Sequence, residues 1–275
     1  MSRPIGVIDS GLGGLTVVAE IMRQLPKEEI VYIGDSARCP YGPRTMEEVR
    51  TFTWEMIARL QRENVKMVVI ACNTATAVVL EEARERLEVP VVGVIQPGAT
   101  SAIQASARQH IAVIGTTGTI LSNAYAIALQ EINSDVQVES LACPLFVPLV
   151  EQGIFSGDEA ERVVRESLEP LGAFDFDALI LGCTHYPLLK EVIASHLPRA
   201  VAVISSGEET AREVSSLLFH HNIQRKSGDK PVHRFFTTGG AVHFRELASQ
   251  WMDITMPTVE SIQLPMLAER PRVDK

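Results

Sequence analysis

Two cysteines each follow an apolar run that is expected to form a strand, a position where catalytic residues often lie. Cys72 follows the apolar run MVVI, in the stretch ACNTAT, and Cys183 follows ALIL, in GCTHYP. A single buried cysteine is ordinary, because cysteine often packs as a small hydrophobe. Two of them at the carboxyl ends of strands, where open parallel sheets bind ligands, indicate a functional site. Each precedes residues able to begin a helix, whose N-terminus stabilises a thiolate.

A pair of thiols facing each other across a cleft suits the inversion of a carbon centre by proton transfer. One group removes a proton from one face while the other delivers a proton to the opposite face, and the roles exchange in the reverse reaction. An unperturbed thiol titrates at ~8.5, near enough to neutrality for one thiolate and one thiol to coexist. The other two cysteines, Cys39 and Cys143, each precede a proline without a helix signal. We expect them to be structural.

Zinc binding and disulfide chemistry are weaker interpretations of the same residues. Zinc would take Cys72, Cys183 and His185, but the chain shows no C-x-x-C pair and no evident fourth ligand. A redox disulfide would bring the two cysteine Cα atoms to within about 5 to 6 Å of each other and leave no room for a substrate. We therefore expect no metal at this site.

The first strand is followed by a glycine-rich turn, IGVIDSGLGGLT, which suggests a dinucleotide-binding loop with Asp35 as the ribose ligand. Two residues oppose that interpretation. Thr16 stands where the third glycine of the fingerprint belongs, and Asp9 would place a carboxylate beside the pyrophosphate. Asp-Ser-Gly after a strand is also a common turn and cap sequence.

Apolar, β-branched runs alternate with helical patterns along the chain, which predicts an α/β fold with mainly parallel sheets. Buried strands are expected at 5–8, 30–33, 67–70, 91–95, 111–114, 178–181 and 200–204. Two of the intervening helices are expected to begin with a capping box, 45–63 at Thr45 and Glu48 and 157–169 at Ser156 and Glu159.

The chain repeats itself at an offset of a little over one hundred residues. In order, IGVIDSG matches IAVIGTT, CPYG matches CPLF, VVIACNT matches LILGCTH, and VVGVIQPG matches VAVISSG. This duplication predicts two pseudo-symmetric α/β lobes with the site in the cleft between them. We expect the first lobe at 1–97 plus 207–255, the second at 98–206, and a loosely held tail at 256–275.

Composition limits the partners. The 275 residues carry a formal net charge of −9, which argues against nucleic acid as the main partner, because phosphate contacts require clustered Lys and Arg. No apolar run approaches the ~18 residues of a membrane span, and no charged-then-apolar leader opens the chain. We therefore expect a cytoplasmic protein without a membrane partner, whose cysteines remain thiols.

Five stretches, GVIDSGLGGLTV, CPYG, ACNTATA, GVIQPGA and GCTHYPLL, resemble in order and spacing the bacterial glutamate racemases of the aspartate/glutamate racemase family. The resemblance runs from about residue 4 to 255. It implies a cofactor-independent isomerase that interconverts L- and D-glutamate and supplies D-glutamate for peptidoglycan, and hence for cell wall biogenesis and cell shape. It also implies a homodimer.

The resemblance further assigns roles to individual residues. Cys72 would abstract the α-proton of D-glutamate and Cys183 that of L-glutamate, with Asp9, Glu151 and His185 as the polar neighbours that tune the thiols. The implied substrate-binding residues are Asp9, Ser10, Pro40, Tyr41, Gly42, Cys72, Asn73, Thr74, Thr116, Thr119, Cys183, Thr184 and His185.

Pyridoxal phosphate is not expected, because none of the six lysines lies at a strand end beside a phosphate-binding glycine loop. Two alternatives to glutamate racemisation remain. The same two-thiol scaffold would serve an aspartate racemase or another amino-acid racemase, since sequence does not measure the depth of the pocket. The chain would otherwise act chiefly as a regulatory protein that binds DNA gyrase.

Overall fold

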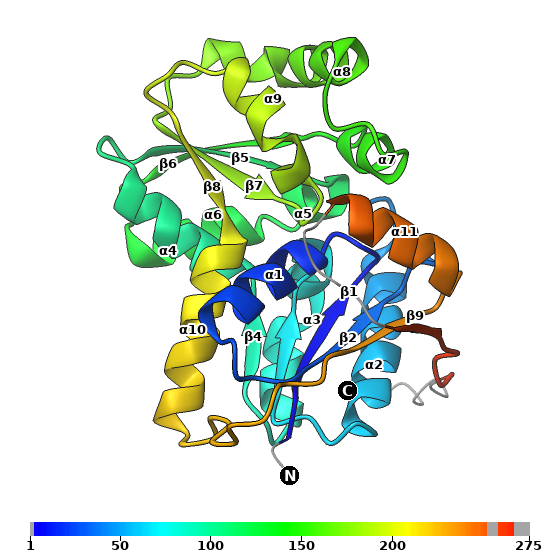
Figure 1. Ribbon diagram of the computed structural model, residues 1–275. Helices are drawn as coiled ribbons and strands as arrows, with labels where there is room; N and C mark the ends of the chain where they lie inside the picture. Colours follow the sequence, from blue (N-terminus) through cyan, green and yellow to red (C-terminus); the bar gives the residue numbers. More distant parts are fainter. Residues whose placement is uncertain (1–2, 252–257, 267–275) are drawn as a thin grey trace, which may run out of the picture.

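The computed structural model describes residues 3–251 and 258–266, and it contains two parallel sheets (Figure 1). The first sheet has the strand order β10-β9-β2-β1-β3-β4 and the second has the order β6-β5-β7-β8. Their bounds are β1 Ile5–Asp9, β2 Ile30–Gly34, β3 Met67–Ile70, β4 Val91–Gly93, β5 His110–Gly115, β6 Gln137–Ala142, β7 Ala178–Gly182, β8 Ala202–Ser205, β9 Arg234–Thr237 and β10 Val259–Ser261.

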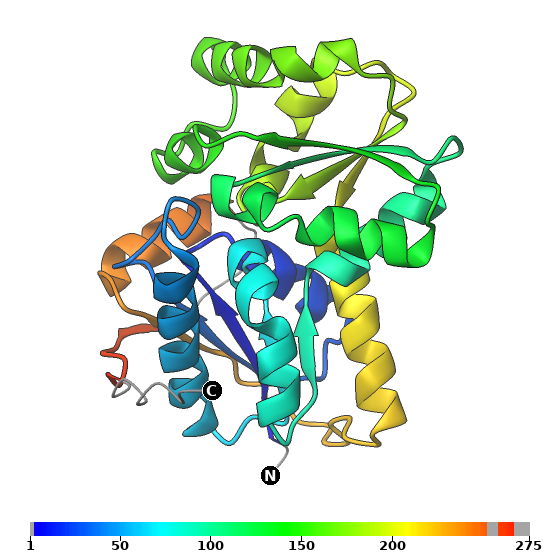
Figure 2. The same cartoon turned by 180° about the vertical axis from the view of Figure 1, so that it is seen from behind.

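Helices flank both sheets, so the predicted fold class is confirmed. The α-helices are α1 Leu15–Gln24, α2 Met46–Gln61, α3 Asn73–Arg86, α4 Ile95–Ala105, α5 Thr117–Leu121, α6 Ala124–Ile132, α7 Phe146–Glu151, α8 Asp158–Leu168, α9 Lys190–Ser195, α10 Ser206–His220 and α11 Ala241–Trp251; the 3₁₀ helices are η1 Glu169–Ala173 and η2 Tyr186–Leu189. Figure 2, seen from behind, shows α2 and α3 on the face of the first sheet opposite α1 and α10.

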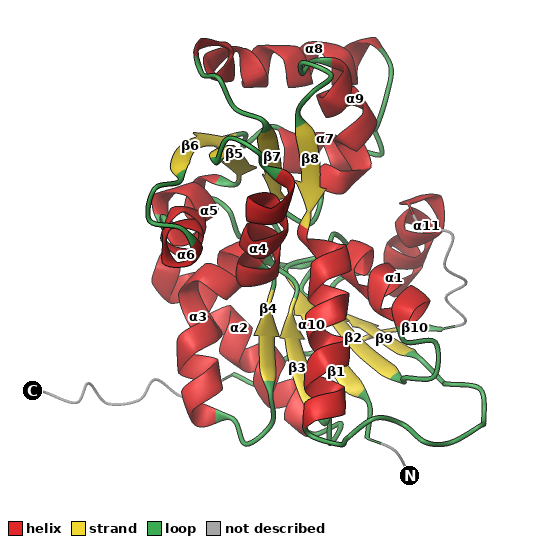
Figure 3. Ribbon diagram, turned by 90° about the vertical axis from the view of Figure 1, so that its left-hand side faces the viewer, coloured by secondary structure: helices red, strands yellow, loops and turns green. Residues whose placement is uncertain are grey.

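The internal repeat is visible in the order of the strands. Strands β2-β1-β3-β4 of the first sheet and β6-β5-β7-β8 of the second follow the same order, and the matched motifs place β1 on β5, β3 on β7 and β4 on β8. Figure 3 shows β4 and β8 pointing toward each other from the two lobes. The carboxyl ends of both sheets therefore meet at the boundary between the lobes, where the strand-end residues gather.

Burial explains why the strands are so uniformly apolar. All five residues of β1, β2 and β7 are buried, as expected for parallel strands covered by helices on both faces. The prediction for 91–95 is too long, because the strand ends at Gly93 and Ile95 already begins α4.

The two predicted capping boxes have different outcomes. At α2 the box is present: the backbone N–H of Glu48 donates to Thr45 Oγ1 at 3.2 Å and the N–H of Thr45 donates to Glu48 Oε2 at 2.9 Å. The box predicted at Ser156 and Glu159 is wrong. Gly157 occupies the cap position of α8 with φ of 86° and without a side-chain cap bond, because its left-handed conformation turns the chain one residue past the serine.

The chain returns to the first lobe after β8. Helix α10 packs on α1, β9 pairs with β2, and β10 extends the sheet beyond β9. Within the tail expected at 256–275, Val259–Ser261 thus forms an edge strand, while 256–257 and 267–275 lie outside the described residues. The lobe boundaries expected from the sequence remain a prediction.

Candidate active site

Cys72 lies between β3 and α3 and caps the helix. Its Sγ accepts a hydrogen bond from the backbone N–H of Ala75 at 3.5 Å. Burial raises the pKa of the Cys72 thiol to about 12, and the negative charge of Asp9 adds to the effect, while the hydrogen bond from Ala75 opposes it. Near neutral pH this group is therefore a protonated thiol.

Asp9 ends β1 and links the two lobes. The carboxylate is fully buried; it accepts from the backbone N–H of Gly11 at 3.0 Å and from the Thr184 hydroxyl of the second lobe at 3.3 Å. Burial raises the pKa of Asp9, and the nearby positive charge of His185 acts in the opposite direction. Asp9 thus lies within electrostatic reach of both Cys72 and His185.

Cys183 follows β7 and faces a histidine that is held from its other side. Its Sγ lies 3.9 Å from His185 Nδ1, and His185 Nε2 lies 2.6 Å from Glu151 Oε1, at the end of α7. Burial lowers the pKa of His185, but the hydrogen bonds to Cys183 and Glu151 outweigh that effect and raise it to about 10. A positively charged imidazolium near neutral pH therefore stabilises negative charge on the Cys183 sulfur.

The strand-end residues surround one small cavity of about 10 Å³, which has room for about one water molecule. Eleven residues of the predicted substrate-binding set line it, together with Val147, which the sequence did not suggest. The lining residues are Ser10, Pro40, Tyr41, Gly42, Cys72, Asn73, Thr74, Thr116, Val147, Cys183, Thr184 and His185.

The other three predicted site residues contact lining residues but do not line the cavity themselves. Asp9 and Glu151 reach it through Thr184 and His185 respectively. Thr119 does so through hydroxyl contacts of 3.1 Å with both Thr74 and Thr116, which are themselves 2.9 Å apart. The sequence-based set is thus brought together around one cavity, from elements of both lobes.

Asn73 lines the cavity and is held in place by Tyr125. Asn73 Oδ1 accepts from the Tyr125 hydroxyl at 2.7 Å, which fixes the amide so that Nδ2 is directed away from Tyr125. That buried Nδ2 has no hydrogen-bond partner among residues 3–251 and 258–266. A buried donor without a partner is costly, and Asn73 Nδ2 is such a donor in a residue that lines the cavity.

Two further residues near the site were missed by the sequence analysis. Tyr125 lies on α6 and orients Asn73. Trp251, at the end of α11, packs its ring against His185 with centroids 5.9 Å apart. Neither follows a strand, so the rule that active residues gather at strand ends does not find them; a large aromatic residue in a helix most often indicates core packing.

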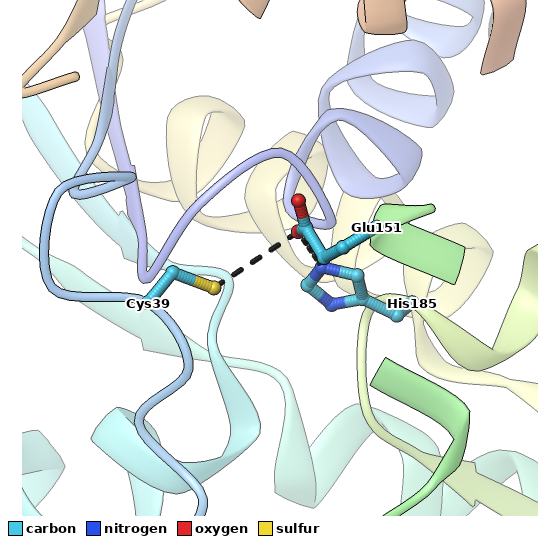
Figure 4. A group of neighbouring side chains, drawn as sticks. All are labelled: Cys39, Glu151 and His185. Atoms are coloured by element: carbon cyan, nitrogen blue, oxygen red, sulfur yellow. Dashed lines mark hydrogen bonds and ion pairs between the residues drawn. The ribbon is translucent and has the colours of Figure 1, made fainter. Parts of the chain in front are cut away.

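A further cluster adjoins the cavity. The ligand atoms of Cys39, Glu151 and His185 all lie within 4.8 Å of one another (Figure 4). The zinc ligands considered from the sequence were Cys72, Cys183 and His185. Within the described part of the chain, the structure brings a different group to metal-ligand distance. Cys39, expected to be structural, has its thiol directed at Glu151 Oε1 at 3.9 Å.

The two α/β lobes, with a thiol from each lobe in one cavity, fit the arrangement expected of a racemase. The family model described as Asp/Glu/Hydantoin racemase matches residues 5–214, and the chain belongs to that family. The resemblance drawn from the sequence and the predicted isomerase class are therefore confirmed. Among the described residues, no helix combines the length and apolar character needed to cross a bilayer.

Named relatives match almost the whole chain. A glutamate racemase of Shouchella clausii is 70% identical over 264 residues, which cover 96% of this chain and 95% of the relative. The crystal structure of glutamate racemase isoform RacE1 from Bacillus anthracis has a TM-score of 0.93 and 48% identity, covering 96% of this chain and 99% of that one. Glutamate racemase from Francisella tularensis, solved in complex with D-glutamate, has a TM-score of 0.89 and 36% identity, covering 95% and 98%.

Proposed function

We propose that this chain interconverts L- and D-glutamate by proton transfer between two cysteines, without an organic cofactor. The proposal rests on the different surroundings of the two thiols. Cys183 faces a histidine whose pKa is raised to about 10, whereas burial raises the pKa of Cys72 to about 12. The named activity of the relatives supports glutamate as the substrate.

In the L-to-D direction, Cys183 acts as the base. Its thiolate takes the α-proton from one face of L-glutamate, the C–H bond breaks, and the electron pair remains on the α-carbon. The Cys72 thiol then delivers its own proton to the opposite face, which leaves a thiolate at Cys72. The imidazolium of His185 stabilises the starting thiolate of Cys183, and its Nε2–H donates a hydrogen bond to Glu151 that holds the ring in place.

The carbanion requires stabilisation because no electron sink is provided. Preorganised donors around the α-carboxylate supply it. Asn73, Thr74 and Thr116 all line the cavity, and the unpartnered Nδ2 of Asn73 and the two hydroxyls are donors of the kind this role needs. The buried carboxylate of Asp9 lies near both ends of the cavity and attracts the substrate ammonium.

Substrate entry requires the lobes to separate. A cavity of about 10 Å³ has room for about one water molecule and not for glutamate. Contacts between the lobes hold it closed, among them the backbone bond from Gly118 N to Gly42 O at 2.9 Å and the bond from Thr184 to Asp9.

Solvent exchange in deuterated water tests the two-base mechanism. Each enantiomer gives its proton to one cysteine and receives deuterium mainly from the other, so early product carries the label while early recovered substrate carries little. Cys72→Ser and Cys183→Ser each lose racemisation in both directions by on the order of 10²-fold or more. The matched control is Cys143→Ser, which changes a buried cysteine outside the cavity lining.

The mechanism is wrong if either Cys72→Ser or Cys183→Ser is folded by far-UV circular dichroism and racemises glutamate near the wild-type rate. Equal labelling of both pools from the start would also contradict it. The substrate assignment has its own measurement, the comparison of kcat/KM for L-glutamate, L-aspartate and L-glutamine. A preference for aspartate would overturn glutamate as the substrate and leave the two thiols in place.

We also propose that the product D-glutamate enters peptidoglycan synthesis in the cytoplasm and that the chain works as a homodimer. The peptidoglycan role predicts that cells depleted of the protein require added D-glutamate to keep their shape. Sedimentation of the purified chain measures its oligomeric state, and a monomer at working concentration would contradict the dimer.

A further inference from the structure

Three side chains with different donor atoms converge beside the cavity, from three separate parts of the fold. Cys39 follows β2, Glu151 ends α7, and His185 follows β7. One carboxylate oxygen, Glu151 Oε1, lies 3.9 Å from Cys39 Sγ and 2.6 Å from His185 Nε2, and Figure 4 shows it between the sulfur and the ring. His185 lines the cavity, whereas Cys39 and Glu151 do not.

The donor set is suited to zinc. Sulfur, imidazole nitrogen and carboxylate oxygen are the three ligand types that tetrahedral Zn²⁺ takes, and with zinc bonds of ~2.0 to 2.3 Å adjacent ligands sit roughly 3.3 to 3.5 Å apart. The nitrogen and oxygen, now 2.6 Å apart, would have to separate by roughly 0.7 Å to reach that spacing. The Glu151 side chain is 32% exposed, which permits this movement and admits a water as the fourth ligand.

The guanidinium of the adjacent Arg38 is paired with Asp35 and Glu55. Zinc bound by the cluster would convert the Cys39 thiol to a zinc-bound thiolate.

The histidine is already oriented as a zinc ligand. His185 Nε2 faces Glu151, while Nδ1 faces Cys183 Sγ at 3.9 Å. Metal-bound histidines usually donate their second ring N–H to a neighbouring acceptor, which fixes the ring and the tautomer. Here a hydrogen bond from Nδ1–H to the Cys183 sulfur would take that role.

We propose that Cys39, Glu151 and His185 form an inhibitory binding site for Zn²⁺. Binding releases the thiol proton of Cys39 and the Nε2 proton of His185, and it changes no oxidation state. Because His185 Nε2 and Glu151 Oε1 must move apart to hold zinc, the imidazole shifts relative to the Cys183 sulfur. Zinc bound there therefore lowers the rate of racemisation, and a chelator restores it.

Direct binding to the full chain, without substrate, tests the site. Titration calorimetry with Zn²⁺ measures affinity, and Co²⁺ as a probe gives a sulfur-to-metal charge-transfer absorption only when a thiolate is bound. The wild type binds one zinc ion. Cys39→Ser binds zinc at least ~10-fold more weakly, as expected when a ligand is lost, and gives no charge-transfer band with Co²⁺. Cys143→Ser, the matched control, retains both.

Two results would overturn the proposal. Unchanged zinc affinity in Cys39→Ser is one, and a charge-transfer band that persists there but disappears in Cys72→Ser or Cys183→Ser is the other, because it would place the metal on the cavity thiols. Glu151→Gln provides a second variant if Cys39→Ser does not fold, and it too must weaken zinc by at least ~10-fold. Because binding is measured without turnover, the test stands even if the chain does not racemise glutamate.

Discussion

One methyl group added at Gly13 should disturb the active site, because it would collide with residues of the second lobe. Gly13 lies between β1 and α1, at the contact between the lobes, and a Cβ there would fall 2.5 Å from His185 Nδ1 and 2.4 Å from Thr184 Oγ1. Ordinary contacts begin at 3.4 Å, so Gly13→Ala must displace the imidazole by roughly 0.9 Å, a misplacement large enough to cost about 10²-fold in rate.

The assay is circular dichroism of glutamate in both directions. Gly13→Ala should lower kcat/KM by about 10²-fold because Nδ1 moves relative to the Cys183 sulfur, while the protein remains folded. Gly172→Ala is the matched control, since a Cβ at Gly172 meets nothing within 4 Å. If Gly13→Ala were as active as this control, the close approach of the lobes would not position His185, and the proposed role of that histidine would lose its geometric basis.

Two other changes have predicted outcomes. Because the pKa of His185 is raised from 6.5 to about 10, its protonation stabilises the fold fully below pH 6.5, and this contribution is lost as the pH rises through about 10. Glu151→Gln removes one cause of the raised pKa, so the alkaline loss of both stability and L-to-D rate should begin at lower pH; profiles that coincide with the wild type would refute this. Thr45→Ala removes the α2 cap and should lower the free energy of unfolding by about 1 kcal/mol in denaturant titrations, whereas an unchanged midpoint would refute the cap's role.

Most central strands were predictable because parallel strands buried on both faces must be continuously apolar. Strand β6 was not, since its sequence QVESLA mixes polar and apolar residues at a half-exposed sheet edge. Strand β9 begins with the exposed Arg234, and two of the three residues of β10 are exposed, so neither strand shows a continuous apolar run. Their place beside β2 depends on contacts between distant parts of the chain, which local sequence does not encode.

The predicted site residues that follow strands gather at the cavity for a general reason: the carboxyl ends of parallel strands share one edge. Residues on helices carry no such signal. Glu151 was identified only through the resemblance, and Tyr125 and Trp251 were missed. Gly13, interpreted at first as part of a possible dinucleotide loop, has no space for a side chain because the other lobe contacts it.

The path of the chain also sets the order in which the two sheets are completed during synthesis on the ribosome. The strands of the second sheet, β5 to β8, are contiguous in sequence, but β2 of the first sheet has β9 as its other neighbour. Until Arg234–Thr237 emerges, that edge of β2 lacks its partner, and an unpaired strand edge favours aggregation. The lobe whose synthesis begins later is therefore finished earlier, and a nascent chain stopped before β9 leaves one edge of β2 unpaired.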